Sequence, residues 1–214
     1  MSVLCKLCGS TKTKELELDK HYHHCVQCDF IFMDECDHLE EHEEHQRYLQ
    51  HNNTIENSGY VRMFQTFINK ALQPEYSSSK KILDYGSGPN PVFAQIMRMQ
   101  GKAVDIYDPF FSPSTDYLHK QYDIITLTEV IEHIQFPLKN LQPLKNCLKP
   151  YGLLAIMTRI HPGIDRFEKW WYRQDNTHIS FFSNKTTEML ATSLNMRITK
   201  TDGERFFCLQ KTNE

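Results

Sequence analysis

Four of the seven cysteines are spaced as ligands of a metal ion. Cys5 with Cys8 and Cys25 with Cys28 form two Cys-x2-Cys pairs, separated by sixteen residues. Each pair makes a tight turn that directs two thiolates at one point, so two pairs complete a tetrahedral shell around Zn²⁺. Four protein ligands leave no position for water. The spacing therefore predicts a structural zinc ion rather than a catalytic one.

Short strands are expected to carry these turns, as in a small N-terminal zinc ribbon over residues 1–35. The segments 13–18 and 30–32 have the composition of such strands. Three histidines nearby are alternative ligands, because an imidazole can replace a thiolate: His21, His23 and His24. The other three cysteines fit no pair and are predicted to be free thiols: Cys36, Cys147 and Cys208.

Residues 36–78 are predicted to form a helical linker and a lid. The stretch 34–51 is polar and rich in histidine, and His38, His42 and His45 would share one helix face. A solvated face is favoured there over a second metal site. Further along, an apolar stripe predicts a helix packed on the main domain: Phe64, Phe67, Ile68 and Leu72. Hydrogen-bonding side chains between the two are predicted to cover the binding site: Tyr48, His51, Asn52 and Tyr60.

A glycine turn between two predicted strands has the pattern of a nucleoside site. The buried strand 81–85 runs directly into Gly86-Ser87-Gly88, a helix follows to Gly101, and a second strand, 103–107, ends at Asp108. The glycines allow close approach of a ligand to the backbone, and the acid can bind both ribose hydroxyls. The third glycine of a dinucleotide fingerprint is missing, which disfavours a nicotinamide cofactor.

These motifs resemble, in order, those of class I S-adenosylmethionine-dependent methyltransferases over residues 80–212. ILDYGSG is similar to their first motif and YDP to their ribose-binding motif, while YDIITLTEVIEH and LKPYGLLAIMT resemble their fourth strand and the turn into their fifth. The resemblance implies an α/β fold over residues 79–214. Its sheet would be Rossmann-like, doubly wound and mostly parallel, with an antiparallel C-terminal hairpin.

The resemblance also implies which residues bind S-adenosylmethionine. The turn would line the methionine part, Asp84 would support the amino end, Asp108 would hold the ribose and Phe110 would flank the adenine. The implied set is Asp84, Tyr85, Gly86, Ser87, Gly88, Asp108, Pro109, Phe110, Thr128 and Glu129. Glu132, three residues beyond this set, is predicted to be a solvated helix start. Only thirteen residues (110–122) precede the fourth strand, so the usual third strand and its helix must be short or absent.

The segment after the fifth strand is predicted to face the substrate. Trp170 and Trp171 either line an apolar pocket or cover the sheet edge. The string DNTHISFF resembles a stretch of many small-molecule methyltransferases. In it Asp175 would orient His178 as general base for a hydroxyl or amine nucleophile. Residues 196–201 and 205–210 are predicted to be the strands of the closing hairpin.

Length and charge limit the remaining possibilities. A chain of 214 residues accommodates one α/β domain of roughly 150 residues and a small appendage. A net charge of −3 provides no overall field for nucleic acid. No apolar run suits a membrane span and no secretory signal is evident, so a cytoplasmic protein without membrane contact is expected.

The predicted function is methyl transfer from S-adenosylmethionine to a small-molecule nucleophile, with S-adenosylhomocysteine as product and structural Zn²⁺. Two alternatives stay open. One is a methyltransferase that recognises RNA or protein through the zinc knuckle, although nucleic acid is disfavoured. The other is a non-catalytic scaffold with the same fold.

Overall fold

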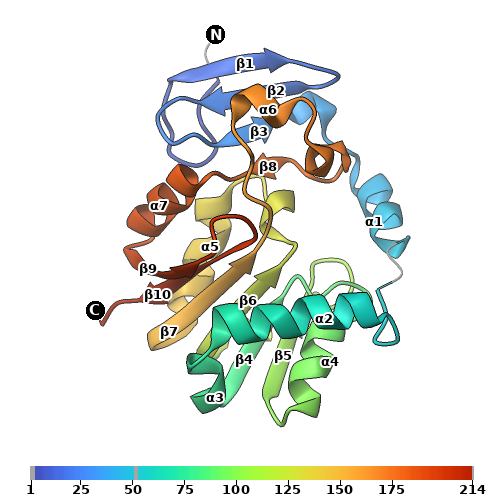
Figure 1. Cartoon of the computed structure of the whole chain (residues 1–214), viewed down its shortest axis with the longest axis vertical. Helices are drawn as coiled ribbons and strands as arrows, with labels where there is room; N and C mark the ends of the chain where they lie inside the picture. The colour runs from blue at the N-terminus through green and yellow to red at the C-terminus, as the bar shows by residue number, and fades with distance from the viewer. Residues whose placement is uncertain (1–2, 51–52, 214) are drawn as a thin grey trace.

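Two β-sheets, one small and one large, organise the chain, and the computed structural model describes residues 3–50 and 53–213 (Figure 1). The small sheet contains β1 (Thr13–Glu17), β2 (His21–Cys25) and β3 (Ile31–Met33), joined in antiparallel order. Its fourth strand, β8 (Ser180–Phe181), comes from the C-terminal half and pairs with β3. Residues almost 150 positions apart in sequence thus share one small sheet.

The large sheet has the strand order β5-β4-β6-β7-β10-β9. Its strands are β4 (Lys81–Tyr85), β5 (Ala103–Tyr107), β6 (Tyr122–Thr128), β7 (Leu148–Met157), β9 (Met196–Thr201) and β10 (Phe206–Lys211). The first four are parallel, and β10 runs antiparallel to both β7 and β9. This confirms the predicted Rossmann-like sheet and its C-terminal hairpin. The central strands β4, β6 and β7 are buried along most of their length because both of their faces are covered.

Helices cover both faces of this sheet. One face carries α2 (Ser58–Phe67), the π-helical turn Ile68–Leu72, α3 (Glu75–Ser78) and α4 (Val92–Met99). The other face carries α5 (Pro137–Asn146) and α7 (Asn184–Ser193). The predicted apolar stripe of α2 is confirmed, since Phe64, Phe67, Ile68 and Leu72 are all buried.

The connection from β5 to β6 is short, as predicted. Among the described residues it contains one 3-10 helix, Thr115–His119, in place of a third strand and its helix. The large sheet consequently has six strands in the described part of the chain. Further 3-10 turns lie at Ile131–His133, after β6, and at Trp171–Gln174, after the short helix α6 (Ile164–Phe167).

The histidine-rich stretch is two elements rather than one helix. A 3-10 turn spans Glu35–Asp37, and α1 (Glu41–Leu49) begins only after Glu40, whose backbone N–H donates to the Glu43 carboxylate. His38 lies between them in an extended conformation, with φ −68° and ψ 144°. The prediction that His38, His42 and His45 share one helix face is therefore wrong.

The small sheet shares a hydrophobic core with the large one. Phe30 packs on Phe182 with ring centroids 5.2 Å apart, and His161 Nε2 donates to the Asp29 carbonyl at 2.9 Å. Residues on both sides of the predicted end of the zinc ribbon, at residue 35, therefore pack in one hydrophobic core. Within the described ranges, no helix is long and apolar enough to cross a membrane.

Candidate active site

A cavity of about 900 Å³ opens at the carboxyl ends of β4, β5 and β6. In parallel sheets this edge is where ligands bind, because the glycine turns and loops of adjacent βα units meet there. All ten residues of the predicted cofactor set line the cavity: Asp84, Tyr85, Gly86, Ser87, Gly88, Asp108, Pro109, Phe110, Thr128 and Glu129. The sequence motifs therefore converge on one space.

The glycine turn requires a glycine at its first position. Gly86 has φ +79°, and a Cβ added there would lie 2.4 Å from Val130 Cγ2. The amide groups of Gly86 and Ser87 both donate to the Tyr107 carbonyl, at 2.7 and 3.1 Å. These bonds attach the turn to the end of β5 and bring its backbone to the cavity wall.

Asp108 organises the loops around it. Its Oδ2 accepts from the Gly88 N–H at 2.9 Å, and its Oδ1 accepts from the N–H groups of Phe110 and Phe111 at 2.9 and 3.1 Å. Only 7% of the residue is exposed. A carboxylate has about four acceptor positions, so Asp108 retains capacity for a ligand hydroxyl while it ties the two loops together.

Two buried polar atoms of the cavity wall have no hydrogen-bond partner among the described residues: Asp84 Oδ2 and Ser87 Oγ. Asp84 is 1% exposed, and Thr126 Oγ1 donates to its other oxygen at 3.2 Å. Burial raises the pKa of Asp84 to about 7, although this hydrogen bond opposes the shift. Buried polar atoms are normally paired. These two suit a ligand that brings a cationic donor to this end of the cavity.

Aromatic side chains form the opposite rim, where α1 approaches the Asp108 loop. The ring centroid of Tyr48 lies 5.7 Å from that of Phe110, and His45 stacks on Phe111 at 5.2 Å. Tyr60 also borders the cavity. Both tyrosines of the predicted lid are thus at the site, whereas His51 and Asn52 lie outside the described residues.

Two acids meet at one tyrosine on the inner side of the site. Tyr172 Oη contacts Glu129 Oε2 at 3.0 Å and also donates to Glu132 Oε1. Burial, together with the nearby charge of Glu132, raises the pKa of Glu129 to about 8. Burial likewise raises the pKa of Glu132.

Glu132 corrects the sequence prediction, because its side chain is fully buried rather than solvated. The turn that carries it is covered by the segment before β8, where the Ile179 N–H donates to the Glu132 carbonyl at 2.8 Å. Glu132 therefore lies in a 3-10 turn rather than at a helix start, and its environment is the core rather than solvent.

His178 borders the cavity, as predicted, but Asp175 does not orient its ring. His178 Nδ1 donates instead to the Tyr172 carbonyl at 2.6 Å. The Asp175 carboxylate is bound to Arg47 Nη2 at 2.7 Å and to Thr177 Oγ1 at 2.7 Å. Burial and the neighbouring His133 lower the pKa of His178, which favours the neutral imidazole.

The two tryptophans are not among the residues that line the cavity. Trp170 packs against Tyr172 with ring centroids 5.2 Å apart, and Trp171 is 60% exposed beside Arg159. Trp170 packs against the core of the small sheet, and the exposed Trp171 fits neither of the two roles that the sequence left open. Sequence reasoning missed His133, which lines the cavity and whose ring centroid lies 4.8 Å from that of His178. The acidic string before it, EVIEH, was the available signal.

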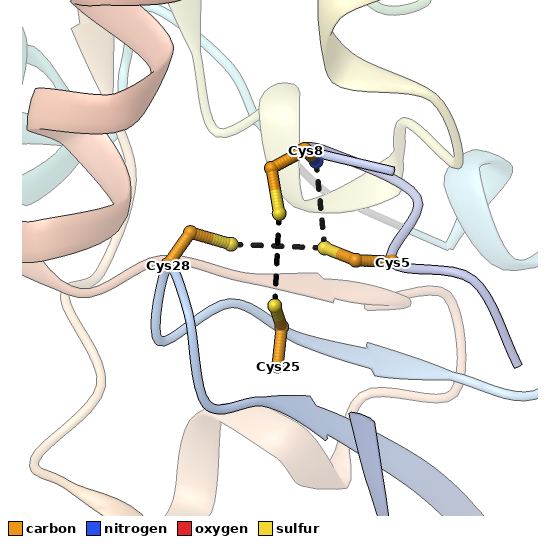
Figure 2. Close-up of side chains that lie close together, drawn as sticks. All are labelled: Cys5, Cys8, Cys25 and Cys28. Carbon is orange, nitrogen blue, oxygen red and sulfur yellow. Dashed lines mark hydrogen bonds between the residues drawn. The ribbon is translucent and has the colours of Figure 1, made fainter. Parts of the chain in front are cut away.

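The four paired cysteines converge in the small sheet (Figure 2). The Sγ atoms of Cys5 and Cys28 are 3.6 Å apart, and those of Cys8 and Cys25 are 3.7 Å apart. A disulfide needs about 2.05 Å. Sulfurs at about 2.3 Å from a tetrahedral zinc ion are about 3.8 Å apart. The cluster therefore has the dimensions of a four-thiolate zinc site.

The nearby histidines make other contacts. His23 Nε2 pairs with Asp34 at 2.8 Å and His24 Nε2 with Asp29 at 2.7 Å, while His21 Nδ1 contacts Asp37. None of the three belongs to the cysteine cluster of the described chain. The cysteines predicted to be unpaired, Cys36, Cys147 and Cys208, are free.

Comparison with known proteins gives matches in family and in fold. Residues 44–201 match a family model described as a methyltransferase domain. None of the curated proteins matches the sequence. An O-methyltransferase family protein from Burkholderia thailandensis superposes with a TM-score of 0.55 and 12% identity, over 79% of this chain and 63% of that one. The present chain thus spans less than two thirds of that protein.

Two further structures have the same fold. A SAM dependent methyltransferase from Archaeoglobus fulgidus gives a TM-score of 0.55 at 12% identity, over 71% of this chain and 94% of that one. The 1,6-didemethyltoxoflavin-N1-methyltransferase of B. thailandensis, with bound 1,6-didemethyltoxoflavin and S-adenosylhomocysteine, gives 0.50 at 12%, over 94% and 100%. Because the family model covers most of the described sheet and the cavity motifs, the chain belongs to the methyltransferase-domain family.

Proposed function

We propose that the protein transfers a methyl group from S-adenosylmethionine to a small-molecule nucleophile. The observation that carries this proposal is the convergence of all ten motif residues on one cavity at the carboxyl ends of the parallel strands. S-adenosylhomocysteine in the toxoflavin enzyme of the same fold supports the choice of cofactor. The cofactor supplies an electrophilic methyl group, and the chain binds and orients both partners.

Each end of the cavity matches one part of the cofactor. Asp84 Oδ2 and Ser87 Oγ have no hydrogen-bond partner in the described part of the chain and can receive the amino and carboxyl groups of the methionine part. Asp108 has acceptor capacity for a ribose hydroxyl, and Phe110 presents a flat face for adenine. Methyl transfer depends mainly on such positioning, because the reacting atoms must lie in line.

The substrate end lies beyond Glu129, where His178 borders the cavity. Because Nδ1 of His178 donates to a carbonyl, Nε2 carries the lone pair and is the candidate acceptor for the proton of a hydroxyl or amine nucleophile. The carbon–sulfur bond of the cofactor breaks as the new bond to oxygen or nitrogen forms. Phe136, three residues after His133, also lines the cavity and supports a substrate with an apolar or aromatic body.

We further propose that the four cysteines hold a structural Zn²⁺ ion. Its function is to fix the small sheet, of which β8 is the last strand, and β8 begins two residues after His178. The cavity retains every motif residue, which disfavours the scaffold alternative. The net charge of −3 gives the RNA-reading alternative no comparable support.

Calorimetric titration with S-adenosylhomocysteine tests the main proposal. Wild-type protein is expected to bind with a dissociation constant in the micromolar range. Asp84→Asn and Asp108→Asn should each weaken binding about tenfold or more, since each removes a charged acceptor. Asp165→Asn, at an exposed position, is the matched control. Absence of heat with the wild type, confirmed by equilibrium dialysis, would refute the proposal.

A further inference from the structure

A second group of metal-ligating side chains lies at the cavity, separate from the four cysteines. Glu132, His133 and His178 each offer one ligand atom, and the three atoms lie within 4.8 Å of one another. Both histidines line the cavity, and Glu132 is fully buried next to them. The residues come from the turn after β6 and from the segment before β8, so the fold of two distant segments creates the group.

Both imidazoles are held in the orientation that metal-binding histidines use. His133 Nδ1 faces the Thr177 carbonyl at 2.8 Å, and His178 Nδ1 faces the Tyr172 carbonyl at 2.6 Å. A carbonyl only accepts, so each Nδ1 carries a hydrogen, and Nε2 is the nitrogen through which each neutral ring would bind a metal ion. Histidine ligands of metals are typically fixed in this way by a backbone acceptor on the outer nitrogen.

Glu132 supplies an independent observation. Tyr172 Oη donates to its Oε1, but its Oε2 is buried without a hydrogen-bond partner among the described residues. Glu129 contacts the same hydroxyl, so two acids share one phenolic hydrogen. An unpaired buried carboxylate oxygen is costly, and a bound cation removes that cost.

We propose that Glu132, His133 and His178 bind one divalent transition-metal ion such as Zn²⁺. Two imidazoles and one carboxylate are a ligand set for such ions, and three protein ligands leave coordination positions open. Metal–ligand bonds of about 2.1 Å need ligand atoms about 3 to 4 Å apart, so side-chain movements of about 1 Å close the site. Both histidines line the cavity, so an ion held there would be within reach of an oxygen or nitrogen atom of the substrate.

This site changes the role of His178. Its Nε2 cannot hold both a metal ion and a substrate proton, so His178 would act on the substrate through the ion instead of as a base. The substrate role rests on the proposed methyl transfer, whereas the metal site does not. The two can therefore be tested on the same samples with separate measurements.

The test is the metal content of tag-free protein, stripped with a chelator under reducing conditions, refilled with Zn²⁺ and desalted. Glu132→Gln and His178→Gln should each contain one equivalent less than the wild type by mass spectrometry. The controls Glu188→Gln and His119→Gln, at exposed positions, should contain the same amount as the wild type. With Co²⁺, the thiolate charge-transfer absorption should persist in both site variants, because the cysteine cluster is unchanged.

Glu132→Gln preserves an acceptor for Tyr172 and nearly the same volume, and its circular dichroism should match that of the wild type. If His178→Gln does not fold, Glu132→Gln alone decides. Wild-type metal content in folded Glu132→Gln would overturn the metal site. If the wild type binds S-adenosylhomocysteine but holds no second equivalent of Zn²⁺, the proposed function stands and this inference is refuted. If it holds the second equivalent but does not bind S-adenosylhomocysteine, the inference stands and the proposed function is refuted.

Discussion

Arg47 Nη2 lies 2.7 Å from Asp175 Oδ2 and connects the helix at the cavity rim to the segment that carries His178. Arg47 belongs to α1, whose Tyr48 packs on Phe110. Burial opposes ionisation of Asp175, but hydrogen bonds from Arg47 and Thr177 outweigh it and lower its pKa. The pair therefore remains ionised across the neutral range and fixes α1 against both halves of the site.

Arg47→Ala should loosen α1 and weaken cofactor retention. A partly exposed ion pair contributes about 1 kcal/mol or less, so the dissociation constant for S-adenosylhomocysteine should rise about two- to fivefold in calorimetry. Limited proteolysis within α1 should also become faster, and S-adenosylhomocysteine should protect less. Arg62→Ala, on the exposed side of α2, is the control. Equal proteolysis rates in Arg47→Ala and wild type would show that the pair does not hold the helix.

Tyr172→Phe should destabilise the protein, because it removes the donor shared by Glu129 and Glu132. A buried acceptor that is left without its hydrogen-bond donor lowers the free energy of unfolding by about 1 to 3 kcal/mol. Urea unfolding at pH 7 measures the difference. Trp171→Phe, a change at an exposed aromatic position, should leave the unfolding midpoint nearly unchanged. A Tyr172→Phe midpoint equal to that of the wild type would mean that the acids do not depend on this hydroxyl.

Stability of the ligand-free protein should fall as the pH rises from about 6.5 to 8. Burial raises the pKa of Asp84 from 3.8 to about 7 and that of Glu129 from 4.5 to about 8. Between its unfolded and folded pKa values, each group binds more protons in the folded state than in the unfolded state. Its contribution to the free energy of unfolding is therefore fully present below the unfolded pKa and is lost as the pH rises through the folded pKa. His178, with its lowered pKa, has the opposite effect mainly below pH 6.5.

Asp84→Asn and Glu129→Gln should each flatten this part of the profile, and their combination should flatten it most. Thermal unfolding at half-unit pH steps gives the slope. Asp165→Asn controls for the loss of an exposed acid. A wild-type melting temperature that rises over the same window would contradict the two raised pKa values.

The sequence predicted best what depends on local pattern. Strands β4, β5 and β9 have the predicted bounds because apolar runs end at glycines and acids that stop a strand. Two relationships could not be predicted in this way. Arg47 finds Asp175 across 128 positions, and β8 is a two-residue strand without a periodic signal. Glu132 looks solvated in sequence because an acid in a first turn has the same pattern whether the turn faces solvent or core.

Cys8→Ser should lower stability and also disturb the active site, because the metal cluster and β8 belong to the same small sheet. The melting temperature should fall by about 10 °C, consistent with loss of several kcal/mol of metal-binding free energy. Zinc content should fall by one equivalent. Thr11→Ala, at an exposed position of the same N-terminal segment, should have neither effect. Unchanged zinc content in Cys8→Ser would contradict the four-thiolate site.

Gly86→Ala should abolish cofactor binding through a clash that a second substitution relieves. The added Cβ would lie 2.4 and 2.7 Å from Val130 Cγ2 and Cγ1, but 3.1 Å from Val130 Cβ. Val130→Ala removes both Cγ atoms. The double variant therefore retains only the 3.1 Å contact with the Cβ of residue 130 and the strain of φ +79°. Such strain costs about 1 kcal/mol, whereas forced overpacking costs about 1 to 3 kcal/mol more.

The control for strain alone is Gly101→Ala, because Gly101 has φ +80° and open space where its Cβ would be. Calorimetry with S-adenosylhomocysteine should rank the affinities with Gly101→Ala close to wild type, Gly86→Ala/Val130→Ala intermediate and Gly86→Ala lowest. Val130→Ala alone measures the loss of its own cavity contacts. If the double variant binds no better than Gly86→Ala, the turn is limited by its backbone conformation, and contact with Val130 is not the reason that glycine is required.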